Sequence, residues 1–262
     1  MRKILSTFLT VAFIVSCLSI TAQSKKESVG YYQITIYNFS SSEQQSLIDS
    51  YLQTAYLPAL HKQKINNIGV FTPITNDTAG NKQLYIIIPV KSAEAVVSLT
   101  KKINSDEQYL LNGKAYLEAV YNNPPYKRME NILLQQFPMA PYFNLPQLKS
   151  AKAERIYELR SYESATEKIF INKVYMFNEG GEIALFKKLG FNAVFYAGVI
   201  AGSQMPNLMY MTSFENREAR EAHWKTFSGS EDWKKLSSMP MYQNNVSKAT
   251  IILMKATNYS DY

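Results

Sequence analysis

YQITIY, residues 32–37, and YELRSY, residues 157–162, are two versions of one strand placed 125 positions apart. Further pairs of segments match in the same order along the chain, at spacings of nearly 125, then 124, then about 120: residues 59–71 with 184–196, residues 84–95 with 208–219, and ENILLQQF with ATIILMKA. A duplicated unit whose loops have since changed slightly in length produces such a pattern. The sequence therefore predicts two similar halves.

Each half has the pattern strand, helix, strand, strand, helix, strand, which is the ferredoxin-like order. In the first half we predict strands at 31–37, 67–74, 83–90 and 128–136, with helices at 43–64 and 92–111. In the second half we predict strands at 154–162, 191–198, 207–214 and 247–255, with helices at 166–189 and 216–236. The proline-containing segment 138–152 is the expected linker between a first half at 23–137 and a second half at 153–262.

Such a half has its helices on one side of a four-stranded antiparallel sheet, so the other side of the sheet must be buried elsewhere. Two halves in one chain can bury both bare sheets against each other. The predicted fold class is therefore α+β, with two tandem ferredoxin-like halves packed sheet to sheet as a barrel.

ERIYELRSYE and the segment from Phe186 to Leu236 resemble the NIPSNAP family. The resemblance is good over residues 154–240 and weaker over 31–137, and it points to a bacterial exported member. It implies the dimeric α+β barrel fold, which agrees with the duplication, but it implies no reaction. NIPSNAP proteins are best known as organellar interaction proteins, and the wider superfamily includes cofactor-free monooxygenases and haem enzymes.

Residues 1–22 have the features of a signal peptide, with Arg2 and Lys3 before a long apolar run and a cleavage site after Ala22. The run is also long enough for a membrane anchor. Cys17, the only cysteine, stands in IVSC, which resembles a lipoprotein box. We expect a periplasmic or secreted protein without disulfides, or alternatively a lipoprotein attached to the membrane through Cys17.

The composition excludes several classes of function. The formal charge is +7, yet the basic residues are scattered, so no nucleic-acid partner is expected. Two histidines and one cysteine make a zinc site improbable, and no other metal site is expected. The chain has no nucleophile elbow, phosphate loop or dinucleotide fingerprint, so we predict no cofactor.

The strand at 157–162 alternates between an apolar and a polar set of side chains. We expect the apolar set to face the helices and the polar set, Glu158, Arg160 and Tyr162, to face the barrel interior or its mouth. Glu158 and Arg160 then either pair with each other and fix the strand register, or hold an anionic ligand. Tyr196 and Tyr210 either line a pocket with Tyr162 or pack between the sheets.

His223 corresponds to Leu99 of the first half, so we expect a partly buried, hydrogen-bonded side chain. A haem ligand or a general base is the alternative. His61 corresponds to Phe186 and has the same structural interpretation.

Gly180 and Gly181 interrupt the apolar pattern of a predicted helix, where each glycine is unfavourable. At the 125 spacing they correspond to Ala55 and Tyr56. The pair indicates a close backbone approach, a ligand cavity, or a kink or break at residues 178–181, and close approach is the expected reason. The flanking Glu179 and Glu182 are expected on the solvent side.

These features predict a small-molecule binding or protein interaction module with no defined catalysis. The candidate ligand-binding residues are Glu158, Arg160, Tyr162, Tyr196, Tyr210 and His223. The alternative is a cofactor-free monooxygenase-like or haem-handling enzyme of the same superfamily. The expected partner is a small molecule or an envelope protein, and whether the protein forms a homodimer is left open.

Overall fold

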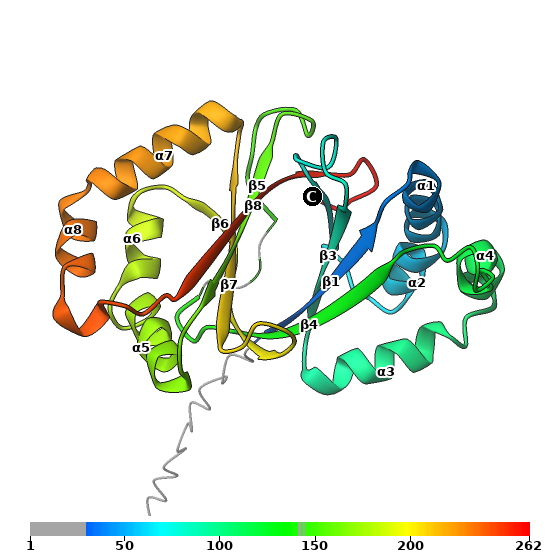
Figure 1. Cartoon of the computed structure of the whole chain (residues 1–262), viewed down its shortest axis with the longest axis horizontal. Coiled ribbons are helices and arrows are strands. Elements are labelled where there is room, and N and C mark those ends of the chain that lie inside the picture. The colour runs from blue at the N-terminus through cyan, green and yellow to red at the C-terminus, as the bar shows by residue number, and fades with distance from the viewer. Residues whose placement is uncertain (1–29, 141–142, 144) are drawn as a thin grey trace, which may run out of the picture.

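The structure, a computed structural model, describes residues 30–140, 143 and 145–262. In this part of the chain, eight strands form a closed barrel, with one group of helices on each side (Figure 1). The predicted signal peptide and Cys17 lie outside the described residues. No helix within them is long and apolar enough to cross a membrane.

Both halves have the predicted order of elements. Three of the predicted helices are divided in two, whereas the one predicted at 43–64 runs without a gap through α1, a π-helical turn at Leu52–Tyr56 and α2. The first half contains β1 (Tyr31–Phe39), α1 (Ser42–Tyr51), α2 (Leu57–Lys62), β2 (Gly69–Pro73), β3 (Lys82–Val90), α3 (Ala93–Ile103), α4 (Glu107–Leu117) and β4 (Arg128–Gln136). The second half contains β5 (Ile156–Glu163), α5 (Glu167–Phe177), α6 (Glu182–Lys188), β6 (Asn192–Ala201), β7 (Asn207–Phe214), α7 (Arg217–Gly229), α8 (Glu231–Ser237) and β8 (Lys248–Ala256).

Side-chain caps explain two of these divisions. The Asp106 carboxylate accepts hydrogen bonds from the backbone N–H groups of Gln108 and Tyr109, and thereby starts α4. The Ser230 hydroxyl accepts one from the N–H of Trp233 and starts α8. A cap of this kind stabilises a helix start by roughly 1 kcal/mol. The single helices predicted at 92–111 and 216–236 were therefore wrong at these positions.

The barrel closes by pairing the edges of the two sheets. The strand order around it is β1-β3-β2-β8-β5-β7-β6-β4. The last strand of each half lies antiparallel to the second strand of the other half, in the pairs β4 with β6 and β2 with β8. The predicted α+β barrel is confirmed, and these shared edges join the halves into one sheet.

The strand register also tests the repeat. In the first half, Ile34 lies opposite Ile87 and Ile132. In the second half, its counterpart Leu159 lies opposite Met211 and Ile252. These equivalent pairs confirm most of the spacings seen in the sequence. In β6, a bulge between Ala193 and Phe195 adds one residue. Tyr196 pairs with Tyr210 and Val70 pairs with Ile86, so Tyr196 corresponds to Val70, 126 positions earlier, and not to Phe71 as the sequence alignment gave.

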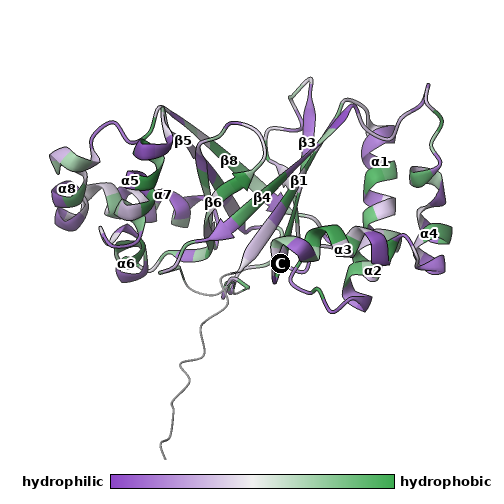
Figure 2. Cartoon of the chain, turned by 90° about the horizontal axis from the view of Figure 1, so that it is seen from below, coloured by the Kyte–Doolittle hydropathy of each residue, from purple (hydrophilic) through white to green (hydrophobic). Residues whose placement is uncertain are grey.

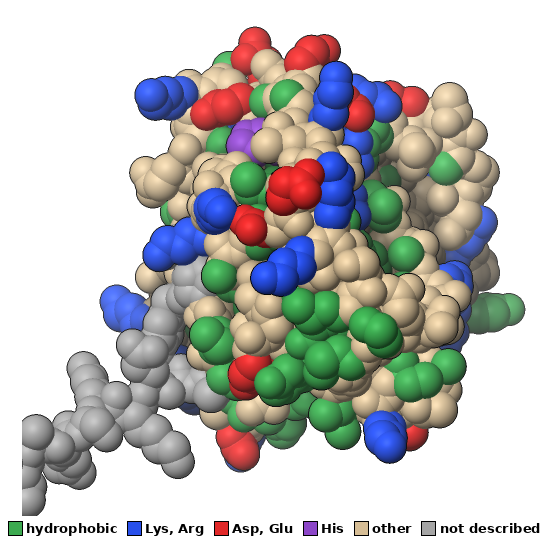
Figure 3. Space-filling model, turned by 90° about the vertical axis from the view of Figure 1, so that its left-hand side faces the viewer, with side chains coloured by type: hydrophobic (Ala, Val, Ile, Leu, Met, Phe, Trp, Pro, Cys, Tyr) green, Lys and Arg blue, Asp and Glu red, His purple; other side chains and the backbone are tan. Residues whose placement is uncertain are grey.

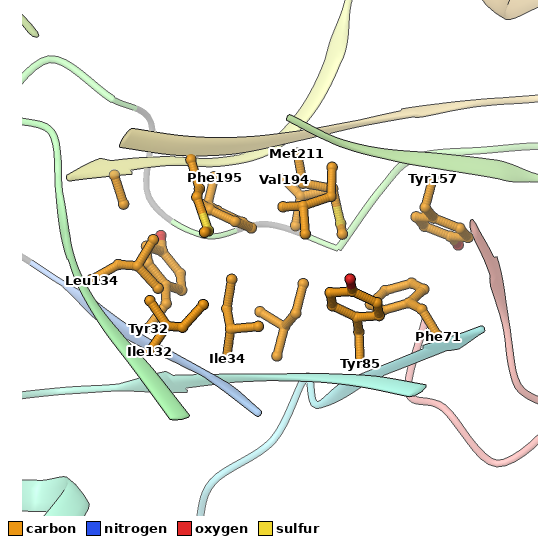
Figure 4. Packing of buried hydrophobic residues seen from close by; sticks show 14 of the residues in the cluster. Tyr32, Ile34, Phe71, Tyr85, Ile132, Leu134, Tyr157, Val194, Phe195 and Met211 are labelled. Carbon is orange, nitrogen blue, oxygen red and sulfur yellow. The ribbon is translucent and has the colours of Figure 1, made fainter. Parts of the chain in front are cut away.

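The apolar side of β5 faces the barrel interior, and the polar side faces the helices. Tyr157 and Leu159 belong to the interior cluster, which all eight strands line with mainly aliphatic and aromatic side chains (Figure 4). Tyr162 packs in a different cluster, beneath α5 to α8. The predicted orientation of β5 was wrong, because its helix-facing side is also buried and obtains its polar partners from the helices.

Hydrophobic residues run along the strands between the two groups of helices. The helices themselves show both hydrophobic and hydrophilic residues (Figure 2). Such a mixture is typical of helices that bury one face. A separate cluster lies under the helices of each half. The molecule therefore has three apolar layers, one inside the barrel and one on each outer side.

The two glycines break the helix. Gly181 has a left-handed backbone (φ 91°) just before α6, and no atom lies within 4 Å of where a Cβ would be. At Gly180, a Cβ would lie 2.6 Å from the backbone oxygen of Met176. Close approach of the backbone at Met176 therefore explains the glycine at 180, as expected. The glycine at 181 is explained by its left-handed backbone conformation, which side chains disfavour. In the first half, a π-helical turn at Leu52–Tyr56 occupies the equivalent place.

The C-terminal residues return to the first half. The Asp261 carboxylate accepts hydrogen bonds from the backbone N–H of Ile68 and pairs with the ring of His61 at 3.0 Å. The Tyr262 ring packs inside the barrel against Phe71 and Tyr157. His61 is thus hydrogen-bonded and half-buried, in line with its structural interpretation.

Candidate functional site

Glu158 is the centre of a polar cluster between the sheet and the helices of the second half. Its carboxylate is fully buried. One oxygen accepts a hydrogen bond from Arg160 Nε at 2.5 Å, and the other accepts from Arg220 Nε at 2.6 Å and Trp224 Nε1 at 2.9 Å. The strand β5 supplies Glu158 and Arg160, while α7 supplies Arg220 and Trp224 four residues apart on one face.

Arg160 extends the cluster toward two tyrosines. Its Nη1 donates to the Tyr162 hydroxyl at 3.0 Å, and that hydroxyl lies 3.0 Å from the hydroxyl of Tyr210. The guanidinium also stacks on Trp224, with Cζ 3.5 Å from the ring centroid. Burial raises the pKa of the Tyr210 hydroxyl well above its ordinary value. Tyr210 therefore stays neutral at physiological pH and serves as a hydrogen-bonding group.

Lys173 and Glu182 form a second buried ion pair, with Nζ and Oε2 2.8 Å apart. Both residues are at most 5% exposed. The expected solvent position of Glu182 was wrong, because the break at Gly181 turns the start of α6 inward, while Glu179 is exposed as predicted. In the first half, the place of Lys173 is taken by the buried Ile48.

His223 and Tyr196 lie outside the hydrogen-bonded cluster. Tyr196 is buried and stacks on Tyr210, with ring centroids 5.7 Å apart. The half-buried His223 ring contacts the rings of Phe191 and Phe214, at 5.2 and 5.8 Å. Within the described residues it has no hydrogen-bond partner, so the predicted hydrogen bond is absent there. The structure thus brings together Glu158, Arg160, Tyr162 and Tyr210 and leaves His223 apart.

The contacts of this cluster favour the structural alternative for Glu158 and Arg160. Each Glu158 oxygen already accepts from the protein, and Tyr196 and Tyr210 are each 1% exposed. The cluster joins β5 to α7 through charge-assisted hydrogen bonds, which are stronger than neutral ones. A role in binding a ligand stays a prediction for these residues. No group of three or more potential metal-ligating side chains occurs in the described part of the chain.

A pocket of about 450 Å³ opens in the first half instead. It lies between the start of β1, the loop after α2, the end of β3 and the helix α3. Its lining combines apolar side chains with amides and lysines, among them Tyr31, Ile65, Val90, Leu99, Asn66, Asn67, Lys64, Lys91 and Lys102. This volume is within the roughly 300–1,000 Å³ range of pockets that hold small molecules.

The equivalent place in the second half is filled. Phe191 and His223 take the positions of Ile65 and Leu99, and Phe191 is packed among aromatic rings. The linker also covers this end, because the Glu215 carboxylate accepts hydrogen bonds from the backbone N–H groups of Lys149 and Ser150. These bonds hold the pKa of Glu215 at about 2. The first half has Lys91 at the place of Glu215.

Residues 157–261 match the NIPSNAP family model. The second half is a NIPSNAP domain. The polar cluster and the filled counterpart of the pocket lie within it, and the open pocket of the first half lies outside the match. No curated protein matches the chain.

Solved structures with the same fold cover the NIPSNAP domain and the first half together. A proposed monooxygenase from Fusobacterium nucleatum superimposes with a TM-score of 0.58 at 6% identity, over 88% of this chain and 93% of its own. One from Lactobacillus acidophilus gives 0.56 at 9% identity, over 87% and 94%. An anthrone oxidase-like protein gives 0.53 at 9% identity, over 88% and 92%. At these identities the comparison shows the fold alone.

Sequence reasoning missed three polar residues of the NIPSNAP domain and the first-half pocket. Arg220 and Trp224 lie more than 60 positions from Glu158, although their spacing on a helix beside a carboxylate-bearing strand was a usable signal. Lys173 stood on the apolar stripe of a predicted helix, which indicates a buried partner. The pocket left no motif, because the one clear difference in side-chain size is Ile65 in place of Phe191.

Proposed function

We propose that the protein is a small-molecule binding module that takes up its ligand in the first-half pocket. The NIPSNAP domain closes the barrel and supports the first half without supplying a catalytic group. One observation carries this proposal: the two halves share a fold, yet one has an open 450 Å³ pocket where the other is filled by Phe191 and His223.

A pocket-filling variant tests the proposal. Ala95 lines the pocket on α3, and Ala219 is its half-buried counterpart on α7. Two fluorescent probes, anilinonaphthalene sulfonate and the uncharged N-phenyl-1-naphthylamine, are titrated into purified wild type, Ala95→Phe and Ala219→Phe. We expect saturable one-site binding of at least one probe that Ala95→Phe abolishes and Ala219→Phe preserves. If neither probe shows an Ala95-dependent site, the pocket does not bind small molecules.

The fold shared with proposed monooxygenases favours a rival function, a cofactor-free oxygenase or a haem-handling enzyme. A shared fold does not fix a reaction. Two measurements separate the rival from the binding module: the Soret band after haem is added, and oxygen consumption with an anthrone as substrate. A His223-dependent Soret band or anthrone-dependent oxygen uptake would establish the enzyme in place of the binding module.

The helical side of the second half motivates a protein-interaction role as well. Its surface mixes charges above a gathering of hydrophobic side chains (Figure 3). Ile171, Tyr175 and Met241, on α5 and after α8, are exposed there. Light scattering of the purified protein measures whether it forms a dimer, which this surface could join. If the protein is a monomer, an envelope protein is the expected partner.

Export is also part of the proposed function, with residues 1–22 removed. Mass spectrometry of the mature N-terminus distinguishes cleavage after Ala22 from lipidation of Cys17. A chain that retains residues 1–22 unmodified would contradict both.

A further inference from the structure

Three lysines surround the opening of the first-half pocket. Lys64, Lys91 and Lys102 line it from the loop after α2, the end of β3 and the helix α3. All three are exposed, and none of the acidic side chains that the structure describes contributes to the lining. Within the described residues, none of the three ammonium groups forms an ion pair or a side-chain hydrogen bond, whereas the neighbouring Lys62 pairs with Asp106 at 2.8 Å. The opening therefore carries uncompensated positive charge.

The rest of the lining is mixed. Tyr31, Ile65, Val90, Ala95 and Leu99 give apolar surface, and polar groups come from Gln63, Asn66, Asn67, Ser98 and Gln136. Apolar walls with a few convergent polar groups are typical of sites that bind small organic molecules. A ligand that matches both parts has an apolar body and an acidic group.

The backbone at Lys64 supports a role for this side chain. Lys64 follows α2 with a left-handed φ of 62°, and its counterpart Gly190 follows α6 with a φ of 71°. The two helix ends have equivalent hydrogen bonds, from Ile65 N to Leu60 O and from Phe191 N to Phe186 O. Glycine is the usual residue at such a helix end. A side chain is unfavourable in this conformation, so the first half keeps a lysine at a position that favours glycine.

The lysines are specific to the first half. The counterparts of Lys64, Lys91 and Lys102 are Gly190, Glu215 and Thr226, and none of these is basic. Positive charge and open volume therefore occur together in one half and are both missing from the other. A merely solvated surface gives no reason for this coincidence.

We propose that the first-half pocket binds an amphipathic organic anion, with an aromatic or aliphatic body against the apolar walls and a carboxylate, sulfonate or phosphate near the three lysines. This inference rests on the proposed function, because it names the ligand class of the same pocket. Lysine suits such a ligand as a point charge that can follow an acidic group at the surface.

The two probes differ in their sulfonate, so they test the ligand class directly. Anilinonaphthalene sulfonate is compared with N-phenyl-1-naphthylamine on wild type, on the triple variant Lys64→Gly/Lys91→Gln/Lys102→Gln, and on Lys101→Gln as a neighbouring control. We expect the triple variant to weaken binding of the sulfonate about tenfold, since it removes three exposed charges and each contributes roughly a twofold change in affinity. Binding of the uncharged probe should change less than about twofold, and Lys101→Gln should change neither. Increasing the salt concentration should weaken binding of the sulfonate probe to wild type more than binding to the triple variant.

The outcomes separate the two proposals. Suppose that Ala95→Phe abolishes binding, but that neither the triple variant nor added salt changes the affinity for the sulfonate probe. The proposed ligand class is then wrong, while the proposal that the pocket binds small molecules is supported. If no Ala95-dependent site appears for either probe, the pocket itself fails and the ligand class with it. Circular dichroism of each variant shows that it is folded, and Lys64→Gly introduces the residue that Gly190 already provides at the same backbone conformation.

Discussion

The two halves share their topology and strand register but differ in what lies between sheet and helices. Toward the barrel interior, both β1 and β5 present tyrosine and aliphatic side chains. Toward the helices, the first half has Gln33 and Thr35 where the second has Glu158 and Arg160. The barrel interior therefore constrains both copies alike, because each shares that interior with the other. The helix-facing layers belong to one half each and have been free to diverge.

In the second half this freedom produced a filled, charged layer, and in the first half it left a pocket. Glu158, Arg220 and Trp224 connect β5 to α7, and the linker covers the end of the sheet. The first half has neither feature among its described residues. Substitutions that exchange residues between the halves therefore measure how much each difference contributes.

The largest effect is expected from Glu158→Gln, which installs the residue of the first half. The change leaves Arg160 and Arg220 close together without their carboxylate. Breaking a buried ion pair typically costs about 3–5 kcal/mol, and we expect the upper end because two cations lose one partner. Urea unfolding measures the loss. The matched change Gln33→Ala removes hydrogen bonds to Thr35 and Asn131 and should cost about 1 kcal/mol. Equal losses would show that the cluster is not a special feature of the second half.

Lys173→Met comes next, with an expected loss of about 3 kcal/mol, because it leaves the buried Glu182 carboxylate unpaired. The double variant Lys173→Met/Glu182→Leu removes both charges and imitates the apolar first half around Ile48. It should recover to within about 1 kcal/mol of wild type. Thermal and urea unfolding of both variants measure this. A double variant as unstable as the single one would mean that the pair itself is required.

Gly190→Ala should cost about 1–2 kcal/mol, because alanine must adopt a left-handed backbone. Space is not the reason, since the nearest atom to a Cβ there, Cε1 of His223, is 3.9 Å away. The converse change Lys64→Gly should leave the free energy of unfolding unchanged or raise it by up to about 1 kcal/mol. Urea unfolding compares the two. A clear loss in Lys64→Gly would show that the lysine side chain stabilises the fold and would remove the argument from strain.

The smallest effect is expected from Glu215→Gln and depends on pH. The folded-state pKa of Glu215, about 2, is below its ordinary value of 4.5, because the N–H groups of Lys149 and Ser150 donate to the carboxylate. Its contribution to stability is therefore complete above pH 4.5 and is lost as the pH falls toward 2. The stability difference between wild type and variant should be constant above pH 5 and shrink below it. Urea unfolding at a series of pH values checks this, and a difference that does not vary with pH would mean the linker is held by other contacts.

The sequence predicted the repeat and the barrel because apolar alternation and turn spacing are local signals. It did not predict which side of β5 faces the interior, since both sides are buried and each contains a tyrosine. The alignment of residues 59–71 with 184–196 was displaced by one residue, because nothing in the apolar run shows where the extra residue lies. Other contacts were missed for a different reason. Arg220 and Trp224 lie on a helix far along the chain from Glu158, and Lys173 pairs with Glu182 only because the chain breaks at Gly181.

The crossed edges of the barrel, β4 with β6 and β2 with β8, have a consequence for how this molecule can evolve. They are the contacts that two identical chains would make about a twofold axis. In such a pair, every mutation appears twice, so a cavity cannot be closed on one side and kept on the other. Covalent fusion removed that restriction. The two halves of this chain differ in this way, since the first has a pocket of about 450 Å³ where the second packs Phe191 among aromatic rings.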